Sequence, residues 1–245
     1  KNYFEGAIMT ELLYHADSYL KEFQGIVTDV TESGIVLDQT AFYPGGGGQP
    51  NDVGTIRVGD VEYIVPKVSR IDGNIVHELE GGIPNVGDTV TGVLDWNRRH
   101  NLMRTHTSLH ILSGVIWRDY GAQVTGGNME PLGARMDFEF ENLTAEFAEE
   151  VEATVNREID ADYPISARVL PRDEAMAIPD LIRTKINLLP EGISKVRVLE
   201  IHGLDLQADG GTHVASTKEV GRIRIVGHES KGSINKRLRI QVEDA

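Results

Sequence analysis

The sequence contains no cysteine, and this absence excludes three kinds of chemistry at once. A disulfide framework, a cysteine zinc cluster and a cysteine nucleophile all require a thiol. Any metal site must therefore be built from histidine and oxygen ligands. The 245 residues, 40% hydrophobic and 25% charged, otherwise have the composition of an ordinary soluble protein of one or two domains.

Long apolar segments are also missing. No run approaches the roughly 20 residues that a membrane span needs, and the N-terminus lacks the apolar centre of a signal peptide. We therefore expect a cytoplasmic protein. The segment Met9-Thr-Glu-Leu-Leu-Tyr resembles a natural start, so we expect residues 1–8 to be an extension that takes no part in the fold.

Basic residues are scarce, with 24 Lys and Arg against 38 Asp and Glu, for a net charge of −14. This balance opposes general binding to nucleic acid, which depends on neutralising phosphates. Residues 222–239, however, hold six basic residues against the single acid Glu229. A local basic face would suit a transient nucleic-acid partner, and a solvated charged strand and loop explains the same pattern equally well.

The N-terminal third is rich in short β-branched runs separated by glycine, at residues 25–30, 34–38, 55–58, 61–65, 75–79 and 89–94. Such spacing predicts a small antiparallel barrel. Between two runs lies Phe42-Tyr-Pro-Gly-Gly-Gly-Gly-Gln-Pro50. Four consecutive glycines predict a loop whose backbone can approach another group closely, although a simple barrel turn is the alternative. No Gly-Lys-Ser/Thr follows, so this is not a phosphate-binding loop.

His106 and His110 are four residues apart, in a segment with an apolar stripe at helical spacing. On a helix this spacing puts both imidazoles on one face, where they can bind one divalent metal ion. Two structural histidines at the edge of a core are the alternative. Asp95 or Asn97 is placed to cap this helix.

A second pair at the same spacing, Asp209 and His213, follows 99 residues after His110. Three imidazoles and one carboxylate form a reasonable tetrahedral zinc site. Gly210 and Gly211, between the pair, allow a sharp turn and a close approach of the backbone.

The remaining pattern predicts helices and antiparallel strands. Residues 142–161 repeat apolar positions at helical spacing, and a short helix is expected between Pro171 and Pro179. Strands are expected at 165–170, 195–201, 221–226 and 237–242. We therefore predict an α+β fold, with a barrel domain at 9–93 and a domain of helices on an antiparallel sheet at 94–245.

Three segments together resemble the alanyl-tRNA editing proteins of the AlaX family, which are free-standing relatives of the editing domain of alanyl-tRNA synthetase. They are RTHTSLHILSG at 104–114, DLQADGGTHVASTKEVG at 205–221, and the glycine-rich segment at 42–54. The family pattern is His-x-x-x-His followed by Cys-x-x-x-His, and Asp209 stands at the position of the cysteine. The resemblance covers nearly the whole chain from Met9.

The resemblance implies a hydrolase that removes serine, and through its glycine-rich motif also glycine, from tRNA specific for alanine. It implies one zinc ion and catalysis at four residues: His106, His110, Asp209 and His213. It implies a substrate-binding set of Thr125, Gly46, Gly47, Gln49, Gly210, Gly211 and Thr212. No nucleotide-binding motif is present, so ATP is not expected to take part, and no stable protein partner is implied. The alternatives are a non-catalytic tRNA-binding module with a degenerate metal site, and an unrelated metal hydrolase.

Overall fold

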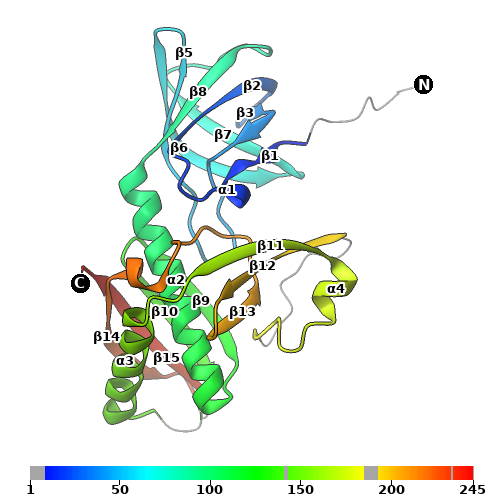
Figure 1. Cartoon of the computed structure of the whole chain (residues 1–245). Helices are drawn as coiled ribbons and strands as arrows, with labels where there is room; N and C mark the ends of the chain where they lie inside the picture. Colours follow the sequence, from blue (N-terminus) through cyan, green and yellow to red (C-terminus); the bar gives the residue numbers. More distant parts are fainter. Residues whose placement is uncertain (1–8, 141–142, 185–192, 233, 245) are drawn as a thin grey trace. The chain divides into compact units, whose positions relative to one another are not determined.

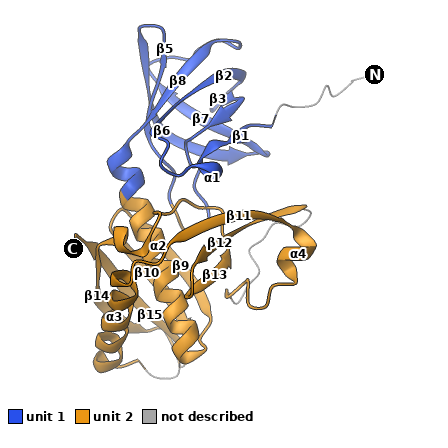
Figure 2. Cartoon of the chain, viewed as in Figure 1, with its two compact units in different colours: residues 1–46, 50–100 blue, residues 47–49, 101–245 orange. Residues whose placement is uncertain are grey.

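The computed structural model describes residues 9–140, 143–184, 193–232 and 234–244. The chain divides into two compact units, one of residues 1–46 and 50–100, the other of residues 47–49 and 101–245 (Figure 2). The expected extension at 1–8 and the expected helix start at Asn142 lie outside the described residues.

The first unit is a closed barrel of six antiparallel strands, in the order β2-β3-β7-β6-β5-β8 (Figure 1). The strands are β2 (Glu22–Thr31), β3 (Gly34–Leu37), β5 (Gly54–Val58), β6 (Val61–Ile71), β7 (Asn74–Glu80) and β8 (Thr89–Leu94). Two short strands, β1 (Glu11–Leu12) and β4 (Gln39–Thr40), pair in parallel, and α1 (Leu13–Ala16) follows β1. The predicted small barrel is confirmed, and its interior is apolar, with Ile35, Ile56 and Val90 fully buried.

The second unit contains a four-stranded antiparallel sheet in the order β14-β15-β10-β9. Its strands are β9 (Val124–Glu130), β10 (Gly133–Glu139), β14 (Arg222–Ser230) and β15 (Asn235–Glu243). Helix α3 (Ala145–Asp160) packs against β14. Its first turn is capped by Thr144, whose hydroxyl accepts a hydrogen bond from the backbone N–H of Phe147 at 3.1 Å.

A smaller antiparallel sheet in the same unit has the order β11-β12-β13. It comprises β11 (Ile165–Pro171), β12 (Lys195–Ile201) and β13 (Asp205–Ala208), with α4 (Arg172–Met176) packed on β11 and β12. A 3-10 turn, η1 (Thr217–Val220), precedes β14. The expected α+β class is therefore confirmed, with helices on antiparallel sheets.

Helix α2 (Trp96–Tyr120) begins in the first unit and continues into the second. The side chain of Asp95 accepts a hydrogen bond from the backbone N–H of Arg98 at 3.0 Å, so Asp95 caps the helix. Residues 102–116 are buried without interruption, polar residues included. In the part of the chain that the structure describes, no helix is long and apolar enough to cross a membrane.

Candidate metal centre

The second unit brings four of the predicted residues to one point. His106 and His110 come from α2, and Asp209 and His213 from the loop that follows β13. One ligand atom from each of these residues lies within 4.8 Å of the others. The three histidines are buried, with between 4% and 8% of their surface exposed.

All three imidazoles turn their Nε2 atoms toward the carboxylate of Asp209. Its Oδ1 lies 3.4 Å from His106 Nε2 and 3.7 Å from His110 Nε2, and its Oδ2 lies 2.9 Å from His213 Nε2. Ligands bound tetrahedrally to zinc at 2.0–2.1 Å are roughly 3.3 Å from one another. The donor types and their spacing therefore fit one zinc-sized ion.

The opposite nitrogen, Nδ1, of each imidazole also has a buried partner. The three pairs are His106 with Gln49 at 2.9 Å, His110 with Asp205 at 2.9 Å, and His213 with Thr107 at 3.1 Å. Both nitrogens of each ring are thus engaged, which fixes the orientation of the ring.

The charges of the cluster follow from burial and from two neighbouring carboxylates, Asp205 and Asp209. Burial lowers the pKa of His106 well below its usual value and that of His213 to about 4. For His110, hydrogen bonds and charges from Asp205 and Asp209 outweigh burial and raise the pKa to about 9. Burial disfavours the charge on Asp209, but the histidines outweigh it and hold the pKa of this carboxyl well below its usual range. At neutral pH Asp209 is therefore ionised and available as a ligand.

Close packing explains one of the two glycines beside the cluster. A Cβ atom on Gly211 would lie 2.5 Å from His106 Nδ1 and 2.7 Å from Gln49 Oε1, so only glycine fits there. A Cβ atom on Gly210 would meet nothing within 4 Å. Thr212 is fully buried, and its backbone N–H donates to Gln49 Oε1 at 3.1 Å.

Arg197 of β12, which no sequence pattern predicted as part of the site, holds the loop that carries Asp209. Its Nη1 atom donates to the carbonyl oxygens of Asp209 and Gly211, each at 3.1 Å, and lies 3.7 Å from the Asp209 carboxylate. The guanidinium thus holds the backbone of the loop and balances part of the charge on Asp209. Its strand is distant in sequence from His106, and no motif marks it.

Asp205, Thr107 and Gln207 were also missed. Asp205 and Gln207 stand four and two residues before Asp209, and side chains alternate between the two faces of a strand. This alternation is the one sequence signal that could have placed them on the face of β13 nearest Asp209. Gln207 Nε2 donates to Asp205 Oδ2 at 2.8 Å.

Among the described residues, three members of the expected substrate-binding set, Thr125, Gly46 and Gly47, make no hydrogen bond to the four clustered residues. The hydroxyl of Thr125 donates to Asn235 Oδ1 at 2.7 Å. Gly46 accepts a hydrogen bond from the hydroxyl of Tyr43 at 3.0 Å, and a Cβ atom on Gly47 would meet nothing within 4 Å. Gln49, by contrast, has its amide oxygen on His106 and its amide nitrogen on Thr212.

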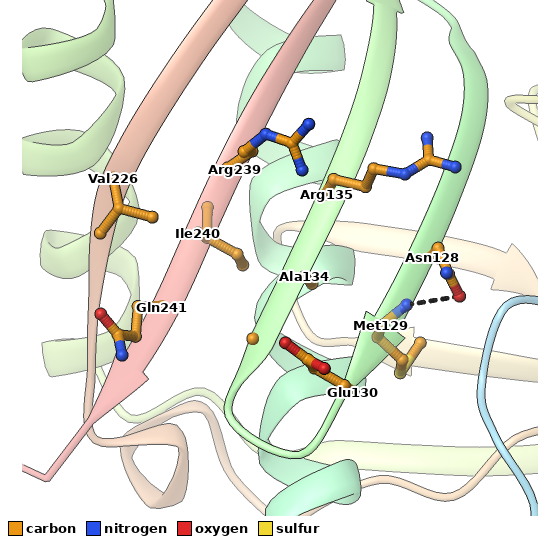
Figure 3. A pocket seen from close by; sticks show the side chains of 10 residues that line it. Asn128, Met129, Glu130, Ala134, Arg135, Val226, Arg239, Ile240 and Gln241 are labelled. Carbon is orange, nitrogen blue, oxygen red and sulfur yellow. Dashed lines mark hydrogen bonds between the residues drawn. The ribbon is translucent and has the colours of Figure 1, made fainter.

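A separate hollow of about 470 Å³ lies on the four-stranded sheet (Figure 3). Arg135 and Arg239, which are paired across β10 and β15, are among its lining residues. Each arginine is ion-paired, Arg135 with Asp137 at 3.2 Å and Arg239 with Glu229 at 2.7 Å. Two arginines of the basic stretch at 222–239 also pair with acids outside it, Arg237 with Asp137 at 2.7 Å and Arg224 with Glu243 at 4.0 Å. The local excess of positive charge is therefore smaller than the count within the stretch indicates.

Two family models match the chain. Residues 8–98 match the model described as "tRNA synthetases class II (A)". Residues 196–239, which include Asp209 and His213, match the "Threonyl and Alanyl tRNA synthetase second additional domain".

Several named proteins are similar over most of the chain. The alanyl-tRNA editing protein AlaX-M of Saccharolobus solfataricus is 42% identical over 233 residues, which is 94% of this chain and 98% of that protein. AlaX-M of Methanosarcina acetivorans is 38% identical over 94% of this chain and 98% of its own length. The alanine–tRNA ligase of Pyrobaculum neutrophilum is 38% identical over 88% of this chain, but this match covers only 25% of the ligase.

Proposed function

The chain belongs to the family of alanyl-tRNA editing proteins, and from this premise we propose that it hydrolyses mischarged tRNA specific for alanine. The proposed substrates are the seryl ester and the glycyl ester, and the products are the free amino acid and the free tRNA. We propose that the reaction takes place in the cytoplasm. We keep the division into a barrel domain at 9–93 and a catalytic domain at 94–245 as part of this proposal.

One observation carries the proposal: three imidazole Nε2 atoms and one ionised carboxylate meet in a buried cluster. We propose that this cluster, made of His106, His110, Asp209 and His213, binds a single zinc ion. When bound, zinc would polarise the ester carbonyl and lower the pKa of a water molecule. Asp209 supplies the negative charge that a thiolate would otherwise provide, through a harder oxygen ligand.

The residues around the cluster have defined tasks in this proposal. Gly211 keeps the loop close to His106, and Arg197 holds that loop through the carbonyl oxygens of Asp209 and Gly211. His106 and His213 stay neutral at pH 7 because burial lowers each pKa, so their lone pairs are available to a metal ion. Thr125 and the glycine-rich segment, with Gly46 and Gly47, are proposed to contact the amino acid or the end of the tRNA.

The test is deacylation of tRNA specific for alanine that carries serine, glycine or alanine. We expect the zinc-loaded protein to release serine at least about tenfold faster than alanine, because a site that hydrogen-bonds a hydroxyl disfavours an analogue without it. Protein treated with a chelator should lose this activity and regain it when zinc is added.

A tRNA-binding module without catalysis is the second candidate, because Asp209 replaces the thiolate of the family pattern. If the zinc-loaded and zinc-free proteins both bind the tRNA and both leave the seryl ester intact, this second candidate is correct. A protein that binds zinc but neither binds nor deacylates the tRNA would contradict both.

A further inference from the structure

The buried partners of His106 and His110 can only accept the hydrogen bond from Nδ1. Asp205 is 4% exposed, and its Oδ1 accepts from Arg183 Nη1 at 2.5 Å while its Oδ2 faces His110 Nδ1 at 2.9 Å. A carboxylate in an ion pair with an arginine has no proton to donate. The proton of this contact must therefore reside on His110 Nδ1.

The orientation of the Gln49 side-chain amide is fixed by the backbone N–H of Thr212. A backbone N–H can only donate, and that of Thr212 points at Gln49 Oε1 at 3.1 Å. The atom that also faces His106 Nδ1, at 2.9 Å, is therefore the amide oxygen, which accepts. Gln49 Nε2 in turn donates to the Thr212 hydroxyl at 2.9 Å, so both ends of the amide are used.

We propose that Gln49 and Asp205 are positioning residues that hold His106 and His110 in the Nδ1–H form when metal is bound, so that the metal takes the place of any proton on the two Nε2 atoms. The inference rests on the zinc site proposed above. It gives Gln49 of the glycine-rich segment a role at the metal ligands instead of the expected contact with substrate. Partners of this kind fix ring orientation and raise the basicity of the ligand, and their loss typically costs 10- to 100-fold in metal affinity.

The contact at His213 differs and is not part of the proposal. Thr107 has a hydroxyl that can donate or accept, and it already accepts from the Val214 N–H at 3.3 Å. The tautomer of His213 therefore does not follow from its partner.

Two substitutions test the proposal through zinc affinity, measured by competition with a chromophoric chelator. In Asp205→Asn the amide oxygen would remain with Arg183, which can only donate, so the amide NH₂ would face His110 and favour the wrong tautomer. In Gln49→Met the acceptor for His106 is lost. We expect each variant to bind zinc about 10- to 100-fold more weakly than the parent.

Two matched variants separate positioning from packing. Gln49→Glu keeps an acceptor for His106 and should bind zinc at least as tightly as the parent. Asp137→Asn alters another buried aspartate, which accepts from Arg237 at 2.7 and 2.8 Å but lies outside the cluster. It should lose stability without losing zinc affinity. Folded Asp205→Asn and Gln49→Met proteins that bind zinc like the parent, or that weaken no more than Asp137→Asn, would overturn the proposal.

A spectroscopic measurement reads the tautomers directly. Long-range proton–nitrogen correlation of the zinc-loaded protein should show protonated Nδ1 on both His106 and His110, and binding through Nδ1 would contradict the proposal. If the parent protein binds no zinc, the proposed zinc site is wrong. The positioning role is then tested in the metal-free protein, by measuring which nitrogen of neutral His106 carries the proton. Protonated Nδ1 supports that role, and protonated Nε2 overturns it.

Discussion

At the scale of single residues, Asp209 is the position where this chain departs from the motif of its family. Its carboxylate contacts all three histidines and also accepts from the Gly211 N–H at 2.7 Å. Its pKa lies well below the usual range because the surrounding histidines outweigh the cost of burial. The position thus keeps a negative charge and loses only the softness of sulfur.

Substitution of Asp209 should change zinc affinity in opposite directions. Asp209→Cys should raise it, because a thiolate selects zinc over harder metal ions. Asp209→Ala should lower it by more than the 10- to 100-fold typical of losing an outer partner. Chelator competition on both variants, with circular dichroism to confirm folding, measures this, and equal affinity in all three proteins would place Asp209 outside the coordination of the metal.

The two glycines before Thr212 form a natural matched pair. Gly211→Ala should weaken zinc binding at least about tenfold, because the new methyl group displaces His106 or the Gln49 that orients it. Gly210→Ala should leave zinc affinity within about twofold of the parent, because space is open there. Equal effects of the two substitutions would show that the loop adjusts freely and that the close approach at Gly211 is not required.

At the scale of elements, α2 is both a buried core helix and the carrier of polar residues of the candidate metal site. It carries two metal-ligand candidates and is buried along residues 102–116. This is possible because its polar side chains find partners: Arg104 Nε donates to the Val220 carbonyl at 2.9 Å, and Thr105 Oγ1 accepts from the Leu132 N–H at 2.9 Å. Buried polar groups that are hydrogen-bonded avoid most of the cost of desolvation.

The start of α2 is tied to the end of the glycine-rich segment by a buried ion pair. Arg99 is fully buried, and its Nε donates to both carboxylate oxygens of Asp52, at 3.1 and 3.0 Å. Asp52 in turn accepts from the backbone N–H of Tyr43 at 2.7 Å. Asp52→Ala should lower the free energy of unfolding by roughly 3–5 kcal/mol, because it leaves a buried charge without compensation.

An exposed pair in the same barrel supplies the control. Lys67 and Glu78 form an ion pair at 2.8 Å with half-exposed side chains, so Glu78→Gln should cost no more than about 1 kcal/mol. Urea unfolding followed by circular dichroism compares the two variants. A similar small cost for both would mean that the buried pair contributes little.

At the scale of the whole molecule, the chain combines two units with different proposed tasks. Among the described residues, the candidate metal ligands all belong to the second unit, which also includes residues 47–49 of the glycine-rich segment. Gly45, Gly46, Gly47 and Gly48 all have positive φ, a conformation that side chains other than glycine rarely adopt. We expect this segment to govern which amino acid is accepted, while the histidines and Asp209 carry the chemistry.

Gly47→Ala should therefore alter the ratio of glycyl to seryl deacylation while zinc content stays at one ion per chain. Gly59→Ala is the matched control, because both glycines have φ near +58° and open space around a Cβ atom. Both substitutions should cost about 1 kcal/mol of stability, but only the first should change selectivity. Joint loss of zinc and activity in Gly47→Ala would argue against a role limited to substrate choice.

The sequence by itself determined the barrel and the α+β class and indicated the two pairs of candidate ligands, because all of these are local patterns. Alternating apolar residues between glycines predict strands, and the spacing of four residues places His106 and His110 on one face of a helix. Asp209 and His213 have the same spacing but lie in a loop. The flanking residues of the two pairs were enough to indicate the family.

Only the tertiary structure decided how the ligands are held. The tertiary structure joins Thr107 to His213 across 106 residues and His110 to Asp205 across 95 residues, and it places Arg197 on the carbonyl oxygens of Asp209 and Gly211. It also showed that the basic stretch near the C-terminus is paired with acids such as Asp137, 100 residues before Arg237. Local periodicity carries no information on such pairs, because the free energy of packing, and not chain connectivity, selects which distant side chains meet.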